Sequence, residues 1–201
     1  MFTKPLAFFR FLYPSLIWKK EGDKKIWLTF DDGPTPKVTE FILSVLKSEK
    51  ILATFFLVGQ DILNNQQIYQ KIKGDGHTIG NHTNSHLNGW KTCSKKYIQD
   101  IEKCQELMKG NVLFRPPYGK MTSKQIFNLK KKYKLILWDI LSYDFKEKNP
   151  TKLKSNVLDN ISDGSILVFH NNTKSYKLLQ ETLRDIIIQL KGMGYSFSNS
   201  W

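Results

Sequence analysis

Two hydrophobic patterns alternate along the chain. Short apolar runs bounded by glycine, proline or polar residues predict buried strands at 26–30, 53–58, 78–80, 112–114, 135–139, 165–169 and 195–197. Between them, apolar residues at helical spacing predict helices at 37–50, 62–73, 94–109, 122–133, 151–160 and 174–191. Regular alternation of strands and helices is typical of a parallel sheet, so we expect an α/β protein whose sheet is open or closed.

The first predicted strand runs into the sequence TFDDGP at 29–34, which places two adjacent carboxylates, Asp31 and Asp32, at its end. In α/β folds the carboxyl ends of the strands carry the chemistry. Two carboxylates there can divide the labour, because one can bind a cation while the other acts as a base. The same residues are also good turn formers, so this segment alone leaves both interpretations open.

Two histidines, His82 and His86, follow the third predicted strand. On one turn of helix, or in a helix-like loop, a spacing of four residues brings both imidazoles within reach of one metal ion. The segment is not the metalloprotease pattern, because no glutamate follows His82. The pair alone is weak evidence, since surface histidines often have this spacing by chance.

Three more strand ends carry side chains of functional types. In RPPYG at 115–119 the prolines stiffen the loop, which either aims Arg115 and the backbone N–H of Tyr118 or is simply a rigid surface loop. A further apolar run leads to Asp139 and Asp144, and the run at 165–169 ends at His170. A lone histidine after an apolar run is more often a core residue than a catalytic one. However, His170 is the fifth functional type of side chain to follow a predicted strand, and this repetition favours the catalytic interpretation.

In this order the five segments resemble the motifs of the NodB-type polysaccharide deacetylases, carbohydrate esterase family 4, from about residue 26 to residue 170. The resemblance implies a distorted, incomplete (β/α) barrel of parallel strands, the NodB homology domain, with the active site at the strand carboxyl ends. It implies a metal-dependent hydrolase that removes N-acetyl groups from amino sugars of a chitin-like glycan, peptidoglycan or a lipid-linked sugar. An O-acetyl esterase acting on acetylxylan-like substrates and an inactive sugar-binding module are the alternatives.

The resemblance makes Asp32, His82 and His86 the ligands of one divalent metal ion. Two neutral imidazoles and one carboxylate leave such an ion with net positive charge and open positions. The ion can then lower the pKa of bound water from about 15.7 to about 7 and polarise a carbonyl. This donor set suits Zn²⁺ and does not exclude Co²⁺ or Ni²⁺.

The resemblance also implies the remaining roles. Asp31 would be the general base that activates a water, Arg115 would pair with it, and the Tyr118 backbone N–H would stabilise the oxyanion. His170 would be the general acid for the leaving group, and Asp144 would hydrogen-bond it and keep it charged. Amide cleavage needs such an acid, because the leaving nitrogen must be protonated.

One position departs from the family pattern. Phe145 follows Asp144 where the family usually has tryptophan, so the wall of an acetyl pocket is kept but an indole N–H is lost. Asp139, next to Trp138, is a rival for the role of Asp144. We prefer Asp144 because it directly precedes the aromatic residue.

The length of the chain limits the number of domains, and its charge limits the kinds of partner that it can bind. The 201 residues suit one domain, 1–201, with 1–25 as an N-terminal covering segment. The net charge is +13, and the lysines are scattered along predicted helices, which favours solvated helix faces. Attraction to an anionic glycan, a phosphate-linked lipid sugar or a membrane surface is the functional alternative. No known nucleic-acid-binding module accompanies the charge, so we expect an acetylated glycan as partner and no nucleic acid, with the oligomeric state left open.

The N-terminal residues are apolar but interrupted by charges and prolines. No run approaches the ~20 residues of a transmembrane helix, and no signal-peptide cleavage site is evident. We therefore favour a cytoplasmic or membrane-peripheral location. A helix that covers the barrel bottom is expected, with a peripheral membrane anchor as the alternative. Its apolar residues would be Phe8, Phe9, Leu12 and Trp18.

The two cysteines, Cys93 and Cys104, flank or lie on one predicted helix. Eleven residues of helix span about 16 Å, which is too far for a disulfide. The cysteines therefore give no evidence of an oxidising compartment.

Overall fold

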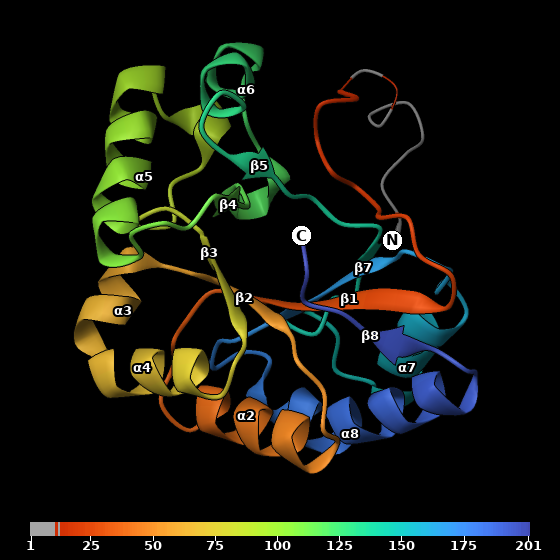
Figure 1. Cartoon of the computed structure of the whole chain (residues 1–201). Helices are drawn as coiled ribbons and strands as arrows, with labels where there is room; N and C mark the ends of the chain where they lie inside the picture. The colour runs from red at the N-terminus through yellow and green to blue at the C-terminus, as the bar shows by residue number, and fades with distance from the viewer. Residues whose placement is uncertain (1–10, 12) are drawn as a thin grey trace.

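The computed structural model describes residues 11 and 13–201, and its centre is an eight-stranded parallel sheet (Figure 1). The strands follow the order β5-β4-β3-β2-β1-β7-β6, and β8 pairs with the start of β1. They are β1 (Lys25–Asp31), β2 (Thr54–Leu57), β3 (Thr78–Asn81), β4 (Leu113–Phe114), β5 (Lys134–Leu135), β6 (Ile140–Leu141), β7 (Ile166–His170) and β8 (Ser196–Phe197). The parallel α/β architecture predicted from the alternating pattern is confirmed.

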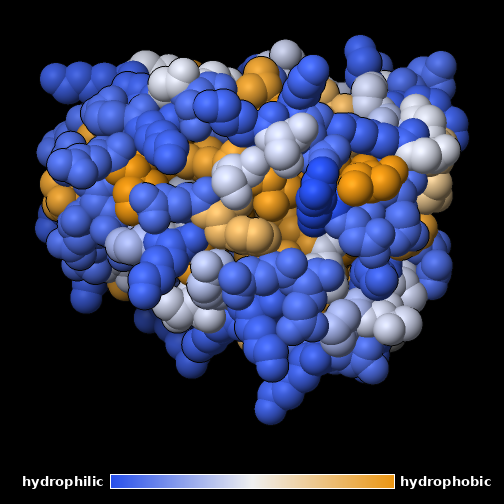
Figure 2. Space-filling model, turned by 90° about the horizontal axis from the view of Figure 1, so that it is seen from below, coloured by the Kyte–Doolittle hydropathy of each residue, from blue (hydrophilic) through white to orange (hydrophobic). Residues whose placement is uncertain are grey.

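Helices cover the outer face of the curled sheet (Figure 1). They are α2 (Val38–Ser48), α3 (Gly59–Asn64), α4 (Gln66–Gly74), α5 (Ser94–Leu107), α6 (Ser123–Leu129), α7 (Pro150–Leu158) and α8 (Tyr176–Gly192), with the short 3₁₀ turns η1 (Gly89–Lys91) and η2 (Pro117–Gly119). Figure 2 views the face that carries α2 and α8, where hydrophilic residues surround a band of hydrophobic ones. None of the helices in the described part of the chain combines the length and apolar content needed to cross a bilayer.

Two predicted elements are wrong in detail. The single helix expected at 62–73 is two helices, α3 and α4, because Asn65 leaves helical geometry at φ −135° and ψ 49°. The strand expected at 135–139 is replaced by the short strands β5 and β6 and an irregular crossing between them. Apolar runs of this length do not reveal which residues pair with a neighbouring strand.

The crossing between β5 and β6 closes the sheet into a distorted barrel. The backbone N–H of Ile136 donates to the carbonyl of Phe114 in β4 at 2.9 Å, and that of Asp139 donates to the carbonyl of Ile166 in β7 at 3.0 Å. The chain therefore passes from one edge of the sheet to the other within a few residues. The incomplete (β/α) barrel implied by the resemblance is confirmed.

Strand β1 is buried on both faces because it lies in the middle of this barrel. Ile26, Leu28 and Phe30 belong to the large apolar cluster under the helices. Trp27 alternates with them and joins a second cluster inside the barrel. Successive side chains of a strand point to opposite faces, so Asp31 also points inward, at the carboxyl end.

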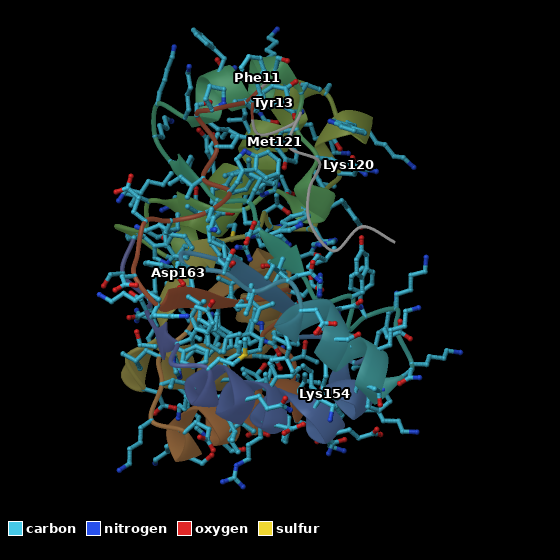
Figure 3. The ribbon with its side chains drawn as sticks, turned by 90° about the vertical axis from the view of Figure 1, so that its right-hand side faces the viewer. Phe11, Tyr13, Lys120, Met121, Lys154 and Asp163 are labelled. Atoms are coloured by element: carbon cyan, nitrogen blue, oxygen red, sulfur yellow. The ribbon has the colours of Figure 1, made fainter. Side chains whose placement is uncertain are left out.

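The described N-terminal residues run along the side of the barrel without helical structure from residue 13 to β1. The backbone of Ile17 bonds to both Leu135 and Leu137 at 2.8 Å. Tyr13 and Trp18 pack against the cluster that includes Met121, and Figure 3 draws Tyr13 beside that residue. The expected contacts of Phe8, Phe9 and Leu12 lie outside the described residues, so the role of 1–25 as a covering segment stays a prediction.

Candidate active site

A cavity of about 660 Å³ opens at the carboxyl ends of β1, β3 and β7. The predicted site residues that line it are Asp31, Asp32, His82, His86, Tyr118 and His170. The other two, Arg115 and Asp144, are fully buried and contact lining residues from below. The structure thus brings together all the side chains that the sequence indicated.

The possible metal ligands are Asp32, His82 and His86, whose ligand atoms all lie within 4.8 Å of one another. Asp32 Oδ1 is 3.2 Å from His86 Nε2 and 3.8 Å from His82 Nε2. Although burial raises the pKa of Asp32, its hydrogen bond with His86 and the neighbouring histidine charges outweigh burial and hold that pKa well below its usual range.

The two histidines do not share a helix, contrary to one form of the expectation. They lie in a loop after β3 in which Thr83 and His86 have φ of 66° and 54°. This left-handed geometry needs support, and Asn81 Oδ1 accepts a hydrogen bond from the Thr83 N–H at 2.9 Å. The Asp100 carboxylate accepts a bond from the Ser85 N–H at 3.0 Å and one from its hydroxyl at 2.6 Å. Sequence reasoning missed both supporting residues.

The surroundings of His82 suit a neutral metal ligand. Its Nδ1 lies 2.8 Å from the backbone carbonyl of Arg115, which can only accept, so Nδ1 carries the proton and Nε2 keeps its lone pair. Burial lowers the pKa of His82 to about 4, despite the opposing charges of Asp31 and Asp32. The donor set therefore fits a divalent cation such as Zn²⁺.

Asn172 is a neighbour of this triad that sequence reasoning missed. Its Nδ2 donates to Asp32 Oδ2 at 2.7 Å. Its own Oδ1 accepts bonds from the backbone N–H groups of Lys174 and Ser175 at 3.0 and 3.2 Å. Asn172 thereby occupies one oxygen of Asp32 and leaves the other toward the histidines. Only its place two residues after His170 could have indicated it.

Arg115 and Asp31 form a buried ion pair beneath the cavity. Arg115 Nη1 lies 2.6 Å from Asp31 Oδ1 and 2.7 Å from Thr29 Oγ1. Its Nη2 donates to the Leu137 carbonyl at 2.9 Å, and the guanidinium lies 4.1 Å from the centre of the Phe56 ring. These contacts with β1, β2 and the crossing after β5 fix the guanidinium, which in turn orients the Asp31 carboxylate.

His170 contacts Asp144 at the opposite side of the cavity. His170 Nδ1 lies 2.8 Å from Asp144 Oδ1, and the His170 backbone N–H donates to Asp144 Oδ2 at 2.7 Å. Burial lowers the pKa of His170, but the Asp144 charge and hydrogen bond, with Asp31 and Asp32, outweigh it and raise the pKa to about 9. His170 is therefore an imidazolium at neutral pH.

The rival carboxylate, Asp139, accepts a hydrogen bond from the Ser165 hydroxyl. The carboxylate beside His170 is that of Asp144, as preferred from the sequence. Phe145 packs edge-on against the His170 ring with centroids 4.5 Å apart, so the aromatic wall persists without an indole N–H.

Tyr118 lies in the turn η2 with φ of 60°, a left-handed conformation that the two preceding prolines help to define. Its hydroxyl lies 3.1 Å from His86 Nδ1. Trp138, Leu141 and Phe145 add apolar wall to the same cavity. An apolar wall beside charged groups suits a molecule with both apolar and polar parts.

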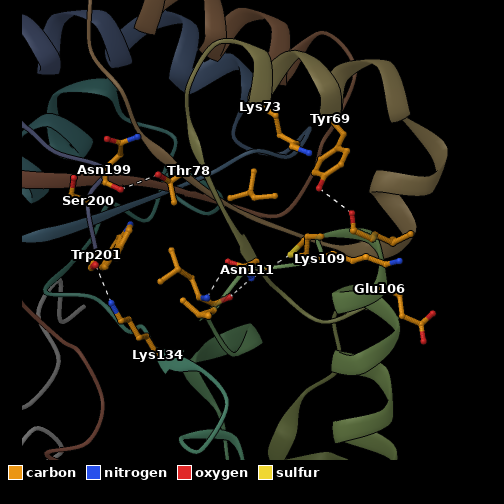
Figure 4. Close-up of a pocket in the computed structure, with 16 residues that line it drawn as sticks. Tyr69, Lys73, Thr78, Glu106, Lys109, Asn111, Lys134, Asn199, Ser200 and Trp201 are labelled. Atoms are coloured by element: carbon orange, nitrogen blue, oxygen red, sulfur yellow. Dashed lines mark hydrogen bonds between the residues drawn. The ribbon is translucent and has the colours of Figure 1, made fainter.

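A second hollow, of about 740 Å³, lies beside α4, α5 and the last residues of the described chain (Figure 4). The Lys134 ammonium there donates to the Trp201 carbonyl at 2.9 Å, and the Thr78 hydroxyl to the Asn199 carbonyl at 2.9 Å. Thr78 and Lys134 begin their strands, so this hollow lies away from the strand ends that carry the site. None of the predicted site residues lines it.

Comparison with known proteins gives consistent matches. The family model described as polysaccharide deacetylase matches residues 19–136. The chain is 34% identical over 182 residues to a Bacillus cereus peptidoglycan-N-acetylglucosamine deacetylase, covering 86% of this chain and 66% of that protein. It is 34% identical over 159 residues to a chitooligosaccharide deacetylase of Azorhizobium caulinodans, covering 75% of each. The crystal structure of a peptidoglycan N-acetylglucosamine deacetylase matches with a TM-score of 0.88 and 30% identity, covering 94% of this chain and 93% of that one.

Proposed function

The chain belongs to the polysaccharide deacetylase family, and on that premise we propose that it is a metal-dependent hydrolase that removes N-acetyl groups from amino-sugar residues of a glycan. One observation carries the proposal. A possible metal triad, a carboxylate paired with a buried arginine and a histidine paired with a buried carboxylate all meet in one cavity. Metal-assisted amide hydrolysis uses a Lewis acid, a base and an acid, and this arrangement offers a candidate for each.

Asp31 is the proposed general base. Its carboxylate lies at the cavity floor and is oriented by Arg115, so it can take a proton from the attacking water. The Tyr118 backbone N–H is the proposed hydrogen-bond donor to the developing oxyanion, a type of contact that is strongest in the transition state.

His170 is the proposed general acid. Its raised pKa keeps it protonated at neutral pH, so it can give a proton to the leaving sugar nitrogen. Because Asp144 accepts from Nδ1, the Nε2 proton is the one to be transferred. Asp144 is a positioning residue, since it acts through the imidazole.

Asp32, His82 and His86 would hold the divalent ion, and Zn²⁺ fits the two imidazoles and one carboxylate, with Co²⁺ and Ni²⁺ as further candidates. When bound, the ion would polarise the acetyl carbonyl and make water more acidic. Asn172 holds Asp32 by its second oxygen, which favours binding of the ion through one oxygen only.

Peptidoglycan is the substrate we favour, because the Bacillus cereus relative and the matched crystal structure are both named for that activity. The named activity of the Azorhizobium relative makes chitin oligomers the second candidate. The same side chains would also serve an O-acetyl esterase, so the leaving group must be tested directly.

The test is a substrate panel with metal-stripped protein reloaded with Zn²⁺, Co²⁺ or Ni²⁺. Mg²⁺ is the matched control, because it prefers oxygen ligands. Acetate release is measured from peptidoglycan, chitin oligomers and acetylxylan. We expect Zn²⁺-dependent release from the two N-acetylated substrates. Release from acetylxylan alone would make the protein an esterase, and no release with any metal would make it an inactive binding module.

A further inference from the structure

Trp90 is a large aromatic residue that the proposed chemistry does not use. It is 60% exposed, yet its indole N–H is already satisfied by the Met121 carbonyl at 2.9 Å. A tryptophan that keeps its N–H bonded to protein while its ring faces water presents a flat apolar surface. Exposure of a single aromatic residue is common, so further observations must give it meaning.

The loop that carries Trp90 is fastened to the rest of the protein. The Trp90 backbone N–H donates to Asn88 Oδ1 at 3.0 Å. The fully buried Gln125 donates through Nε2 to the Gly89 carbonyl at 3.0 Å and the Thr92 carbonyl at 3.1 Å. The indole is therefore held in place before any ligand arrives, which lowers the entropy cost of binding.

The loop that carries Trp90 also contacts the backbone of the loop that runs from Tyr118 to Met121. A Cβ at Gly89 would lie 2.3 Å from the Lys120 carbonyl oxygen, so only glycine fits at this contact. The position of Trp90 is thus tied to the loop that runs from Tyr118 to Met121, which is the rim of the cavity.

Lys120 connects the indole to the cavity. Its ammonium lies 5.0 Å from the centre of the Trp90 ring, and Lys120 also lines the proposed active site. Figure 3 shows where Lys120 and Met121 lie on the molecule. Tyr118, which is 58% exposed, lines the same cavity and contacts His86. Moving outward from the metal triad, one therefore meets Tyr118, then Lys120, then Trp90.

We propose that Trp90 and Lys120 form a glycan-binding subsite outside the catalytic cavity, for a neighbouring sugar that bears a carboxylate. The C–H face of a pyranose ring packs on the exposed indole by dispersion. The Lys120 ammonium, which lies over the Trp90 ring at 5.0 Å from its centre, pairs with the carboxylate of the sugar. This inference rests on the proposed function and refines it, because it selects a glycan whose sugars bear free carboxylates over neutral chitin.

Phe127 shows what the subsite needs beyond an aromatic ring and a lysine. It is 56% exposed, and the Lys131 ammonium lies 4.5 Å from its ring. However, it lies on α6 and does not line the cavity. Phe127 and Lys131 are therefore matched controls for Trp90 and Lys120.

The test compares two tetrasaccharides on the metal-loaded enzyme: a chitin tetramer, and alternating N-acetylglucosamine and N-acetylmuramic acid with free lactyl carboxylates. An aryl acetate serves as the small substrate. For Trp90→Ala we expect kcat/KM on either tetrasaccharide to fall about 10-fold relative to kcat/KM on the aryl acetate. The fall should come mainly from a higher KM for the tetrasaccharides. Lys120→Met should raise KM several-fold more on the acidic tetramer than on the chitin tetramer. Phe127→Ala and Lys131→Met should behave as wild type.

Direct binding of the acidic tetramer, followed by calorimetry on wild type and Trp90→Ala, separates this inference from the proposed function. If no acetate is released but binding weakens in the variant, the function fails and the subsite stands. Equal binding by both proteins would overturn the subsite. The subsite would also be overturned if Trp90→Ala lost binding to anionic phosphatidylglycerol vesicles but kept its affinity for the tetramer. That result would assign the surface to a membrane.

Discussion

Two histidines reach the cavity from opposite sides of β1, and their surroundings change their pKa values in opposite directions. His82 follows β3 and has its pKa lowered to about 4, whereas His170 ends β7 and has its pKa raised to about 9. His82 is buried and His170 is half-buried, with 2% and 16% of their side-chain surfaces exposed. Burial lowers the pKa of each, so it cannot explain the difference.

The difference lies in the partner of Nδ1. For His82 the partner is the neutral carbonyl of Arg115, and for His170 it is the carboxylate of Asp144. A carbonyl only selects the tautomer, while a carboxylate also stabilises the imidazolium. One cavity thereby holds a neutral imidazole suited to a metal and a charged one suited to proton donation.

The largest expected effect comes from breaking the metal side. His86→Ala removes one of the three proposed ligands, so metal and turnover should be lost together, as metal analysis and acetate release would reveal. His77, which is buried outside the cavity, offers the control His77→Gln, which should keep its metal. Full metal content and normal turnover in His86→Ala would refute the ligand assignment.

Asp31→Asn tests the proposed general base while leaving both histidines intact. We expect the metal to remain and kcat to fall by about 10²–10⁴-fold, the usual contribution of a general base. The change also leaves Arg115 buried without its counter-ion, which typically costs about 3–5 kcal/mol, so folding is checked by circular dichroism. Loss of metal from a folded variant would mean that Asp31 and Asp32 have exchanged roles.

His170→Ala removes the charged member of the pair. An amine leaving group needs a proton and an activated phenol does not, so kcat should fall about 10²-fold on an N-acetyl sugar but less than about 10-fold on an aryl acetate. Both substrates are assayed with the same metal-loaded preparation. Equal losses on the two would leave His170 as a structural or oxyanion-binding residue.

Asp144→Asn should make His170 more like His82. The acid must be protonated to act, so activity declines as pH rises through the pKa of His170. Removing the carboxylate lowers that pKa, and the alkaline limb of the rate profile should move to lower pH by about one unit or more. A cation on Asp32 repels the imidazolium, so the wild-type limb should lie below pH 9 when metal is bound. An unmoved limb would assign it to another group.

The sequence predicted the positions of the two histidines better than the contacts that surround them. Both histidines follow apolar runs, so their place at strand ends could be read from the pattern. The resemblance also implied that Asp144 keeps His170 charged and that His82 binds a metal as a neutral imidazole. The Arg115 carbonyl that selects the tautomer of His82 could not be predicted, because it reaches His82 only through the folded barrel. The crossing from β5 to β6 was missed for the same reason, since its hydrogen bonds join residues from separate strands.

The smallest expected effect concerns Asn172. Its substitution should affect the proposed metal ligands and leave His170 unchanged. Its Nδ2 holds Asp32 Oδ2 at 2.7 Å, and two backbone N–H groups fix its own amide. Asn172→Ala would free the Asp32 carboxylate to rotate, so metal affinity should weaken by about 10-fold, as for other groups that orient a ligand. Competition with a chelator measures this change, and Asp144→Asn is the control that should keep its affinity.

At saturating metal, Asn172→Ala should recover most of its turnover, and its alkaline limb should stay where wild type has it, because Asp144 still faces His170. An unchanged metal affinity would mean that the histidines alone orient Asp32. A shifted limb would mean that the two sides of the cavity are coupled through β1, so that the neutral and the charged histidine could not be adjusted independently.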